Sequence, residues 1–131
     1  KHTMQIHQSA EDYLETILML NQRMGRVRSI DVVNELGYTK ASVSIAMKKL
    51  RENGYVAVDG EGNLTLLEPG REIAERIYSR HRLLTHFFVQ LGVDEEVAAE
   101  DACKAEHILS EQTLEKIREY ALLHDAQDSV K

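Results

Sequence analysis

The sequence contains a single cysteine, Cys103, among its 131 residues. One cysteine cannot form an internal disulfide, and this usage fits a reducing compartment. No apolar run approaches the roughly 20 residues that a membrane-spanning helix needs, and the polar start shows no secretory signal peptide. The chain also lacks internal repeats and low-complexity segments. We therefore expect no membrane association and a cytoplasmic chain of one domain or two small ones.

Charge is divided unevenly along the chain. The formal net charge of −6 comes from residues 81–131, which carry 5 basic and 11 acidic side chains, whereas residues 1–80 carry 11 of each. Residues 21–51 carry seven basic and only two acidic side chains. This local positive excess can attract a phosphate backbone, so the acidic total does not exclude a nucleic-acid partner.

Apolar residues recur at helical spacing through most of the chain. The pattern predicts helices over 9–24, 29–36, 40–53, from Pro69 to about 91, 95–108 and 111–124, and short strands over 55–59 and 63–67. Four of these helices are preceded by an expected N-cap: Ser9, Ser29, Asp94 and Ser110. Gly37 is the expected end of the second helix, and residues from Asp125 onward are expected to fray. The fold class is mainly α.

The second and third predicted helices are joined by a short turn at Gly37-Tyr38-Thr39, which is the helix-turn-helix arrangement. The two predicted strands follow, separated by Gly60-Glu61-Gly62 as in a hairpin. A helix-turn-helix followed directly by a small hairpin has the order of a winged helix. We therefore expect a winged-helix DNA-binding domain over 1–70 and an α-helical domain over 71–131.

Small polar and basic side chains lie on the outward side of the third predicted helix. With two arginines that precede the second helix, they are the candidate contacts to DNA phosphates and bases: Arg26, Arg28, Thr39, Lys40, Ser42, Ser44, Lys48 and Lys49. The other interpretation of this pattern is a solvated helix face.

Cys103, Glu106 and His107 form a Cys-x-x-Glu-His run in the fifth predicted helix. Positions i, i+3 and i+4 share one face of a helix, so a thiolate, a carboxylate and an imidazole would point together. That donor set suits a first-row transition metal. Three residues do not complete a coordination sphere, so further ligands are expected elsewhere in the chain.

Three other residues are candidates for the missing ligands. Asp12 and Glu15 lie at i, i+3 on the first predicted helix, and His81 lies within the fourth. A site assembled from helices distant in sequence would couple metal binding to the arrangement of those helices. Each residue also has an ordinary interpretation: a solvated acidic pair in a first helical turn, a surface or core histidine, and for Cys103 a small buried apolar residue.

The helical segment 70–124 has too few helices to cover its own apolar residues. These include Leu83, Leu84, Phe87, Phe88, Ile108 and Leu109. A second copy covering the same patch is the common solution, so we predict a homodimer. Two wings and two reading helices would then meet a palindromic operator.

The order of these elements, with residues 11–17, 37–44, 78–84 and 103–110, resembles the diphtheria toxin repressor family, and most closely its manganese transport regulator branch. The resemblance implies an N-terminal winged helix, a helical metal-binding and dimerisation domain, and Mn²⁺- or Fe²⁺-dependent repression of metal-uptake genes. It implies metal ligands at Asp12, Glu15, His81, Cys103, Glu106 and His107. The protein is expected not to be an enzyme.

Two positions depart from a single branch of that family. Cys103 stands where the manganese branch usually has a carboxylate, and Asp12 stands where the iron branch usually has a methionine. The iron branch's ancillary site would fall on Thr85 and Ala99, and no C-terminal SH3-like barrel is expected. Oxygen ligands favour Mn²⁺ and a thiolate favours Fe²⁺, Co²⁺ or Zn²⁺, so Zn²⁺ or Co²⁺ is expected to substitute in vitro.

Two other functions remain compatible with these residues. One is a small metalloenzyme that uses the same His/Glu/Cys cluster, although no general base or substrate pocket can be recognised. The other is a metal-independent winged-helix regulator with a small organic effector, in which Cys103 senses redox state. A metal-dependent repressor explains both the basic helix-turn-helix and the metal-type residues.

Overall fold

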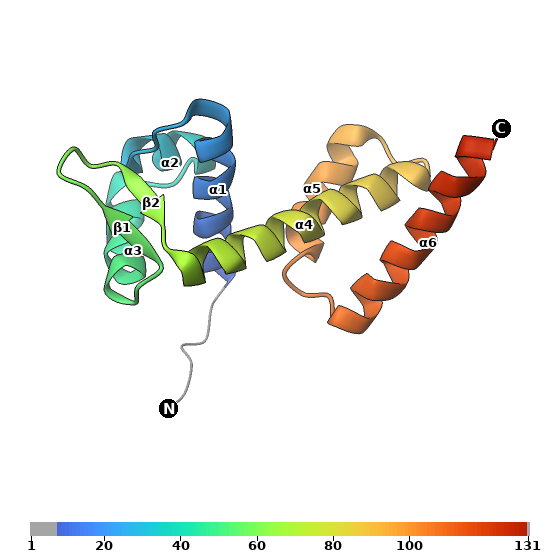
Figure 1. Ribbon diagram of the computed structural model, residues 1–131. Coiled ribbons are helices and arrows are strands. Elements are labelled where there is room, and N and C mark those ends of the chain that lie inside the picture. Colours follow the sequence, from blue (N-terminus) through green and yellow to red (C-terminus); the bar gives the residue numbers. More distant parts are fainter. Residues whose placement is uncertain (1–7, 131) are drawn as a thin grey trace. The chain divides into compact units, whose positions relative to one another are not determined.

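The structure contains the helices and strands expected from the sequence, in the expected order. The computed structural model describes residues 8–130, with side chains through residue 126. The elements are α1 (Gln8–Met24), α2 (Ser29–Leu36), α3 (Lys40–Glu52), β1 (Val56–Val58), β2 (Leu64–Leu66), α4 (Glu68–Gln90), α5 (Glu95–Ala105) and α6 (Glu111–Val130) (Figure 1). They divide into two compact units, Lys1–Arg76 and Ile77–Lys131, so that α4 contributes to both.

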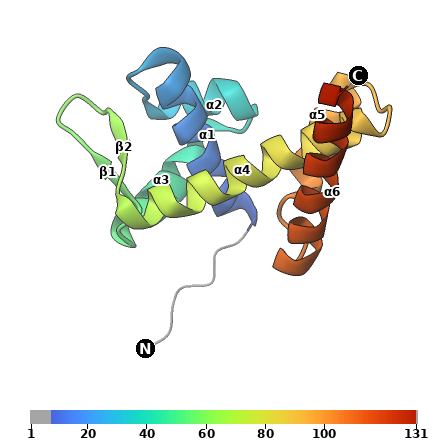
Figure 2. The same ribbon diagram turned by 45° about the vertical axis from the view of Figure 1, so that its right-hand side comes forward.

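The first unit is a winged helix built around α1. Leu14 and Ile17 of α1 are fully buried, and α1 contacts α2, α3 and β2, while α3 contacts β1. The buried stripe of α3 is Val43, Met47 and Leu50, as expected from its spacing. Figures 1 and 2 show the hairpin beside α3. The predicted mainly α fold with an N-terminal winged helix-turn-helix is confirmed.

The wing is a short antiparallel hairpin in which Val56 pairs with Leu66 and Val58 with Leu64. It is the only sheet among residues 8–130. The Leu64 N–H also donates to the Val27 carbonyl at 2.7 Å. That bond attaches the start of β2 to the segment between α1 and α2, so the wing is anchored on the helix-turn-helix as well as through its own strands.

Two of the expected N-caps are wrong by a residue or more. α1 begins at Gln8, which puts Ser9 inside its first turn. The N-cap of α2 is Arg28 rather than Ser29, because the Arg28 N–H donates to the Asp31 carboxylate at 2.9 Å. At the other end of α2, Gly37 has φ 74°, the left-handed conformation that the sequence predicts for a terminating glycine.

The second unit has a small core between α4, α5 and α6. Leu84, Ala102 and Leu114 are its buried centre, with Leu83, Phe88, Ala105, Leu109 and Ile117 packed against it. Ser110 caps α6 as predicted, since the Thr113 N–H donates to the Ser110 hydroxyl at 3.1 Å. None of the helices in residues 8–130 has both the length and the apolar character needed to cross a membrane.

Three predictions about the second unit are wrong. α5 ends at Ala105 instead of near 108, and α6 continues to Val130 where fraying was expected after 124. Asp125 lies within α6 and accepts hydrogen bonds from His86 at 2.9 Å and Gln90 at 2.8 Å. Tyr120 and Leu123 were expected in the buried stripe of α6, but both are exposed, and Ala121 is buried with Leu114.

Candidate metal centre and nucleic-acid interface

Glu106 is the centre of a polar cluster in the second unit. It directly follows α5, keeps right-handed helical angles (φ −61°, ψ −22°), and its N–H still donates to the Ala102 carbonyl. Its side chain is 0% exposed. Full burial of a carboxylate is costly unless positive or donor groups compensate for the lost water. The surroundings of Glu106 therefore indicate what the cluster is built to hold.

Histidines contact both carboxylate oxygens of Glu106. His81 Nδ1 lies 2.9 Å from Oε1, and His107 Nε2 lies 3.5 Å from Oε2. Among the described residues, none forms a hydrogen bond with the buried Oε2. A buried carboxylate oxygen without a hydrogen bond requires explanation, and an ion that the coordinates do not contain is one such explanation.

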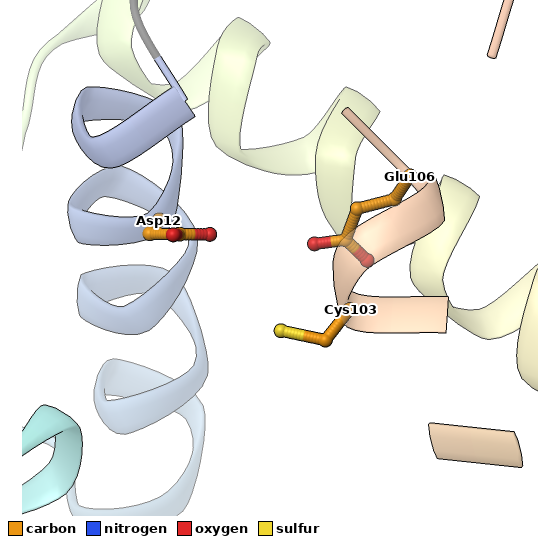
Figure 3. A group of neighbouring side chains, drawn as sticks. All are labelled: Asp12, Cys103 and Glu106. Atoms are coloured by element: carbon orange, nitrogen blue, oxygen red, sulfur yellow. The ribbon is translucent and has the colours of Figure 1, made fainter. Parts of the chain in front are cut away.

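Cys103 adds a sulfur donor on the same side of α5. Its Sγ lies within 4.8 Å of a Glu106 carboxylate oxygen, and Figure 3 shows both side chains extending from the same side of this helix end. Cys103 is exposed. The structure therefore brings together four of the six predicted ligands, His81, Cys103, Glu106 and His107, although α5 ends before the last two.

The remaining two predicted ligands belong to α1 in the first unit. Glu15 is buried at 6% exposure, and Asp12 is half-buried one helical turn earlier. Figure 3 shows the Asp12 side chain projecting sideways from α1. Ionised side chains are seldom buried without a partner, so the burial of Glu15 argues against the solvated first-turn pair that the sequence also allowed.

The residues present fit a divalent transition metal. Imidazole, carboxylate and thiolate are all common ligands of such ions, and Glu106 supplies a buried oxygen that lacks a hydrogen bond among the described residues. The geometry offers no equivalent support for Thr85 and Ala99 as a second site, because neither residue has a side chain that ligates metals readily.

Arg80 is a residue of this region that the sequence did not reveal. Its guanidinium donates to the Glu106 carbonyl at 3.1 Å and to the Glu111 carboxylate at 2.6 Å. The first bond occupies the carbonyl that would accept the next helical hydrogen bond, which helps to end α5 at this point. The partner is a main-chain oxygen 26 residues away, so no spacing rule could have identified it.

The candidate DNA-contacting residues all lie on exposed positions of the first unit. Six of them are on or beside α3: Thr39, Lys40, Ser42, Ser44, Lys48 and Lys49. Thr39 is the N-cap of α3, because its Oγ1 accepts from the Ser42 N–H at 3.0 Å and donates to the Ser42 hydroxyl at 2.9 Å. This bond fixes the start of α3 at the surface that would face DNA.

Arg26 and Arg28 lie beside the tip of the wing. Arg28 Nε and Nη2 donate to the Glu61 carbonyl, the first at 3.0 Å, and Arg26 Nη1 lies 3.8 Å from the Glu61 carboxylate. Hydrogen bonds from the Asn63 and Glu61 N–H groups and the Asn63 amide hold the pKa of Asp59 below its usual value. Arg28 therefore fixes the wing, and Arg26 is the more available of the two for phosphate.

Comparison with known proteins gives matches over both units. Residues 5–64 match the family described as "Iron dependent repressor, N-terminal DNA binding domain". Residues 67–123 match "Iron dependent repressor, metal binding and dimerisation domain".

Individual relatives are similar over most of the chain. An uncharacterised helix-turn-helix-type transcriptional regulator of Methanocaldococcus jannaschii is 37% identical over 113 residues, covering 85% of this chain and 90% of the relative. The transcriptional regulator MntR of Bacillus subtilis is 32% identical, covering 94% of this chain and 87% of the relative.

A solved manganese-dependent transcriptional repressor in complex with manganese has a TM-score of 0.78 and 29% identity. The match covers 86% of this chain and 52% of the solved one. This chain thus spans about half the length of that repressor.

Proposed function

Because this chain belongs to the iron-dependent repressor family, we propose that Mn²⁺ or Fe²⁺ acts as its co-repressor through ligands from both units. The family assignment confirms the resemblance found in the sequence. The chain is a metal-dependent, DNA-binding transcriptional repressor with a dimerisation domain, and not an enzyme. The ligands, the DNA contacts and the operator remain proposals.

The observation that carries the proposal is the buried Glu106 carboxylate. Its Oε1 contacts His81 at 2.9 Å and its Oε2 lies 3.5 Å from His107. Cys103 Sγ lies within 4.8 Å of the same carboxylate. We assign His81, Cys103, Glu106 and His107 as the ligands of the second unit, and Asp12 and Glu15 as those of α1.

A bound divalent ion supplies two positive charges, which lets carboxylates, imidazoles and a thiolate share one site. Asp12 and Glu15 lie on α1, and α1 contacts both α2 and α3. Holding α1 through these carboxylates would therefore fix the helix-turn-helix that carries the DNA-reading residues. The energetic link between metal and DNA runs through α1 in this proposal.

Mn²⁺ and Fe²⁺ are the favoured physiological ions. Asp12, Glu15 and Glu106 offer the oxygen donors that suit Mn²⁺, whereas Cys103 favours softer ions. The Bacillus subtilis regulator and the manganese-bound repressor support manganese as the signal. Zn²⁺ and Co²⁺ are expected to substitute in vitro, because affinity rises along the Irving–Williams series.

On the DNA side, we propose that α3 reads a palindromic operator of metal-uptake genes in the cytoplasm. Thr39, Lys40, Ser42, Ser44, Lys48 and Lys49 face outward for base and phosphate contacts, with Arg26 and the wing, held by Arg28, beside them. The domains of this proposal are 1–70 for DNA and 71–131 for metal and dimerisation.

Exposed apolar side chains in the second unit support a dimer face there. Ile108 is 75% exposed, and Tyr120, Leu122 and Leu123 are exposed on α6. Aliphatic residues left in water at this density favour burial against a second copy. A two-fold dimer would present two copies of α3, which is why a palindromic operator is expected.

The test is operator binding under anaerobic conditions with and without Mn²⁺, Fe²⁺, Co²⁺ and Zn²⁺. The wild-type protein should bind an operator fragment at least tenfold more tightly with metal. Glu106→Gln should lose this response and remain dimeric. Glu100→Gln removes an exposed carboxylate from the same helix and should respond as the wild type does. Metal-independent binding by the wild type would contradict the proposal, and so would a normal response of Glu106→Gln.

A further inference from the structure

Ile45 occupies an unusual place on α3. Successive residues of a helix are about 100° apart, which puts Ile45 almost directly opposite the buried stripe of Val43, Met47 and Leu50. Its side chain is 59% exposed. Among the described residues of α3, Ile45 is the one large apolar side chain that is exposed. It thus lies at the centre of the outward face of the helix.

The residues around Ile45 are either short or basic. Ala41 and Ser42 lie one turn before it, and Lys48 and Lys49 lie one turn after it. We call these four residues and Ile45 the reading face of α3. Short neighbours let the helix backbone approach a surface closely, while the two lysines can extend sideways to phosphates. Ile45 would then be the side chain that reaches deepest.

An isoleucine side chain has no hydrogen-bond donor or acceptor, so what it can recognise is an apolar group. In the major groove, the 5-methyl group of thymine is the apolar group that base pairs present. We infer that Ile45 is a specificity-determining residue that packs against a thymine methyl in each operator half-site. This inference rests on the proposed function, because it requires α3 to lie in the major groove.

The inference can be tested with a double-mutant cycle between protein and DNA. An operator is first selected from random duplexes by the wild-type dimer with Mn²⁺, and each symmetric pair of thymines is then replaced by deoxyuridine, which removes only the methyl. One pair should weaken wild-type binding about fourfold per half-site and about fifteenfold in all, the value of one buried methyl in each. Ile45→Ala should lose a similar factor on the thymine operator and lose nothing further on the deoxyuridine operator.

The matched control is Ile30→Ala, which truncates a 42% exposed isoleucine on α2 of the same unit. It should keep the full methyl dependence of the wild type. An Ile45→Ala protein with undiminished methyl dependence would overturn the inference, and so would a wild type indifferent to every thymine methyl. Failure of the wild type to select any duplex with Mn²⁺ would instead contradict the proposed function itself.

Discussion

Cys103 is the residue with the greatest influence on which ion the site prefers. Its sulfur lies within 4.8 Å of the Glu106 carboxylate, while the other proposed ligands are carboxylates and imidazoles. A thiolate stabilises Fe²⁺, Co²⁺ and Zn²⁺ more than Mn²⁺, because these ions are better matched to a soft donor. The site therefore combines donors suited to different ions.

Replacing that sulfur by oxygen should shift the preference. In Cys103→Asp, Mn²⁺ affinity should be kept or raised while Co²⁺ affinity falls about tenfold, as expected for loss of a soft donor. Anaerobic competition titrations would measure both affinities, and loss of the thiolate-to-Co²⁺ absorption would identify the ligand. Cys103→Ser keeps the size and serves as the control. An unchanged Co²⁺ spectrum in Cys103→Asp would show that Cys103 is not a ligand.

At the same scale, single contacts explain which site residues could be predicted. The ligand types were visible because Cys103, Glu106 and His107 are close in sequence. Arg80 was not visible, because it acts on the main-chain carbonyl of Glu106. Arg28 was predicted as a phosphate contact, but its guanidinium donates to the Glu61 carbonyl. Contacts between a side chain and a distant main-chain atom leave no mark in local sequence.

Among the elements, α3 was predicted most fully. Its bounds, its N-terminal turn and its buried stripe follow from apolar spacing and from Thr39. α5 and α6 were predicted less well, because their ends depend on neighbours. Arg80 draws away the carbonyl that would prolong α5, and His86 and Gln90 of α4 hold Asp125 of α6. Tertiary contacts of this kind override local preference.

The basic side chains of α3 should determine the salt dependence of operator binding. In the double variant Lys48→Gln, Lys49→Gln, operator affinity should fall, and the slope of log affinity against log salt should flatten by about two, close to one per lost phosphate contact. Metal affinity without DNA should stay at the wild-type value. Lys104→Gln changes an exposed lysine of the second unit and provides the control. A double variant with an unchanged salt slope would contradict the assigned role of α3.

The start of α4 contains a close approach between two elements of the first unit. Gly70 is buried, and a Cβ at this position would clash with the Tyr55 carbonyl, which is main chain and cannot rotate away. Gly70→Ala should therefore lower the free energy of unfolding by about 1–3 kcal/mol, the typical cost of overpacking. Urea denaturation followed by circular dichroism would measure it.

Gly60 in the wing loop provides the comparison for that substitution. A Cβ there meets nothing within 4 Å, and the residue does not have the left-handed conformation. Gly60→Ala should leave the free energy of unfolding within about 0.5 kcal/mol of the wild type. Equal stability of the two variants would mean that α4 does not begin against Tyr55 in solution.

At the scale of the whole molecule, the protein combines two functions that must be coupled. The first unit carries the basic winged helix, and the second carries the His81–Glu106–His107 cluster and the exposed apolar residues of α6. The family assignment requires metal and DNA binding to depend on each other. The uneven charge of the sequence already indicated this division of labour.

Coupling of this kind is reciprocal. If Mn²⁺ raises operator affinity by some factor, operator DNA must raise Mn²⁺ affinity by the same factor. Coupling between two sites commonly lies within about 5–150-fold. Equality of the two factors follows from thermodynamics, whereas a factor well above one is the specific claim of a co-repressor.

The most direct measurement is an anaerobic Mn²⁺ titration of the wild-type dimer with and without saturating operator DNA. The proposed coupling predicts Mn²⁺ affinity at least tenfold higher with the operator, and no such increase with a scrambled duplex of equal length. Equal Mn²⁺ affinity in the presence and absence of the operator would contradict metal-dependent repression through these ligands.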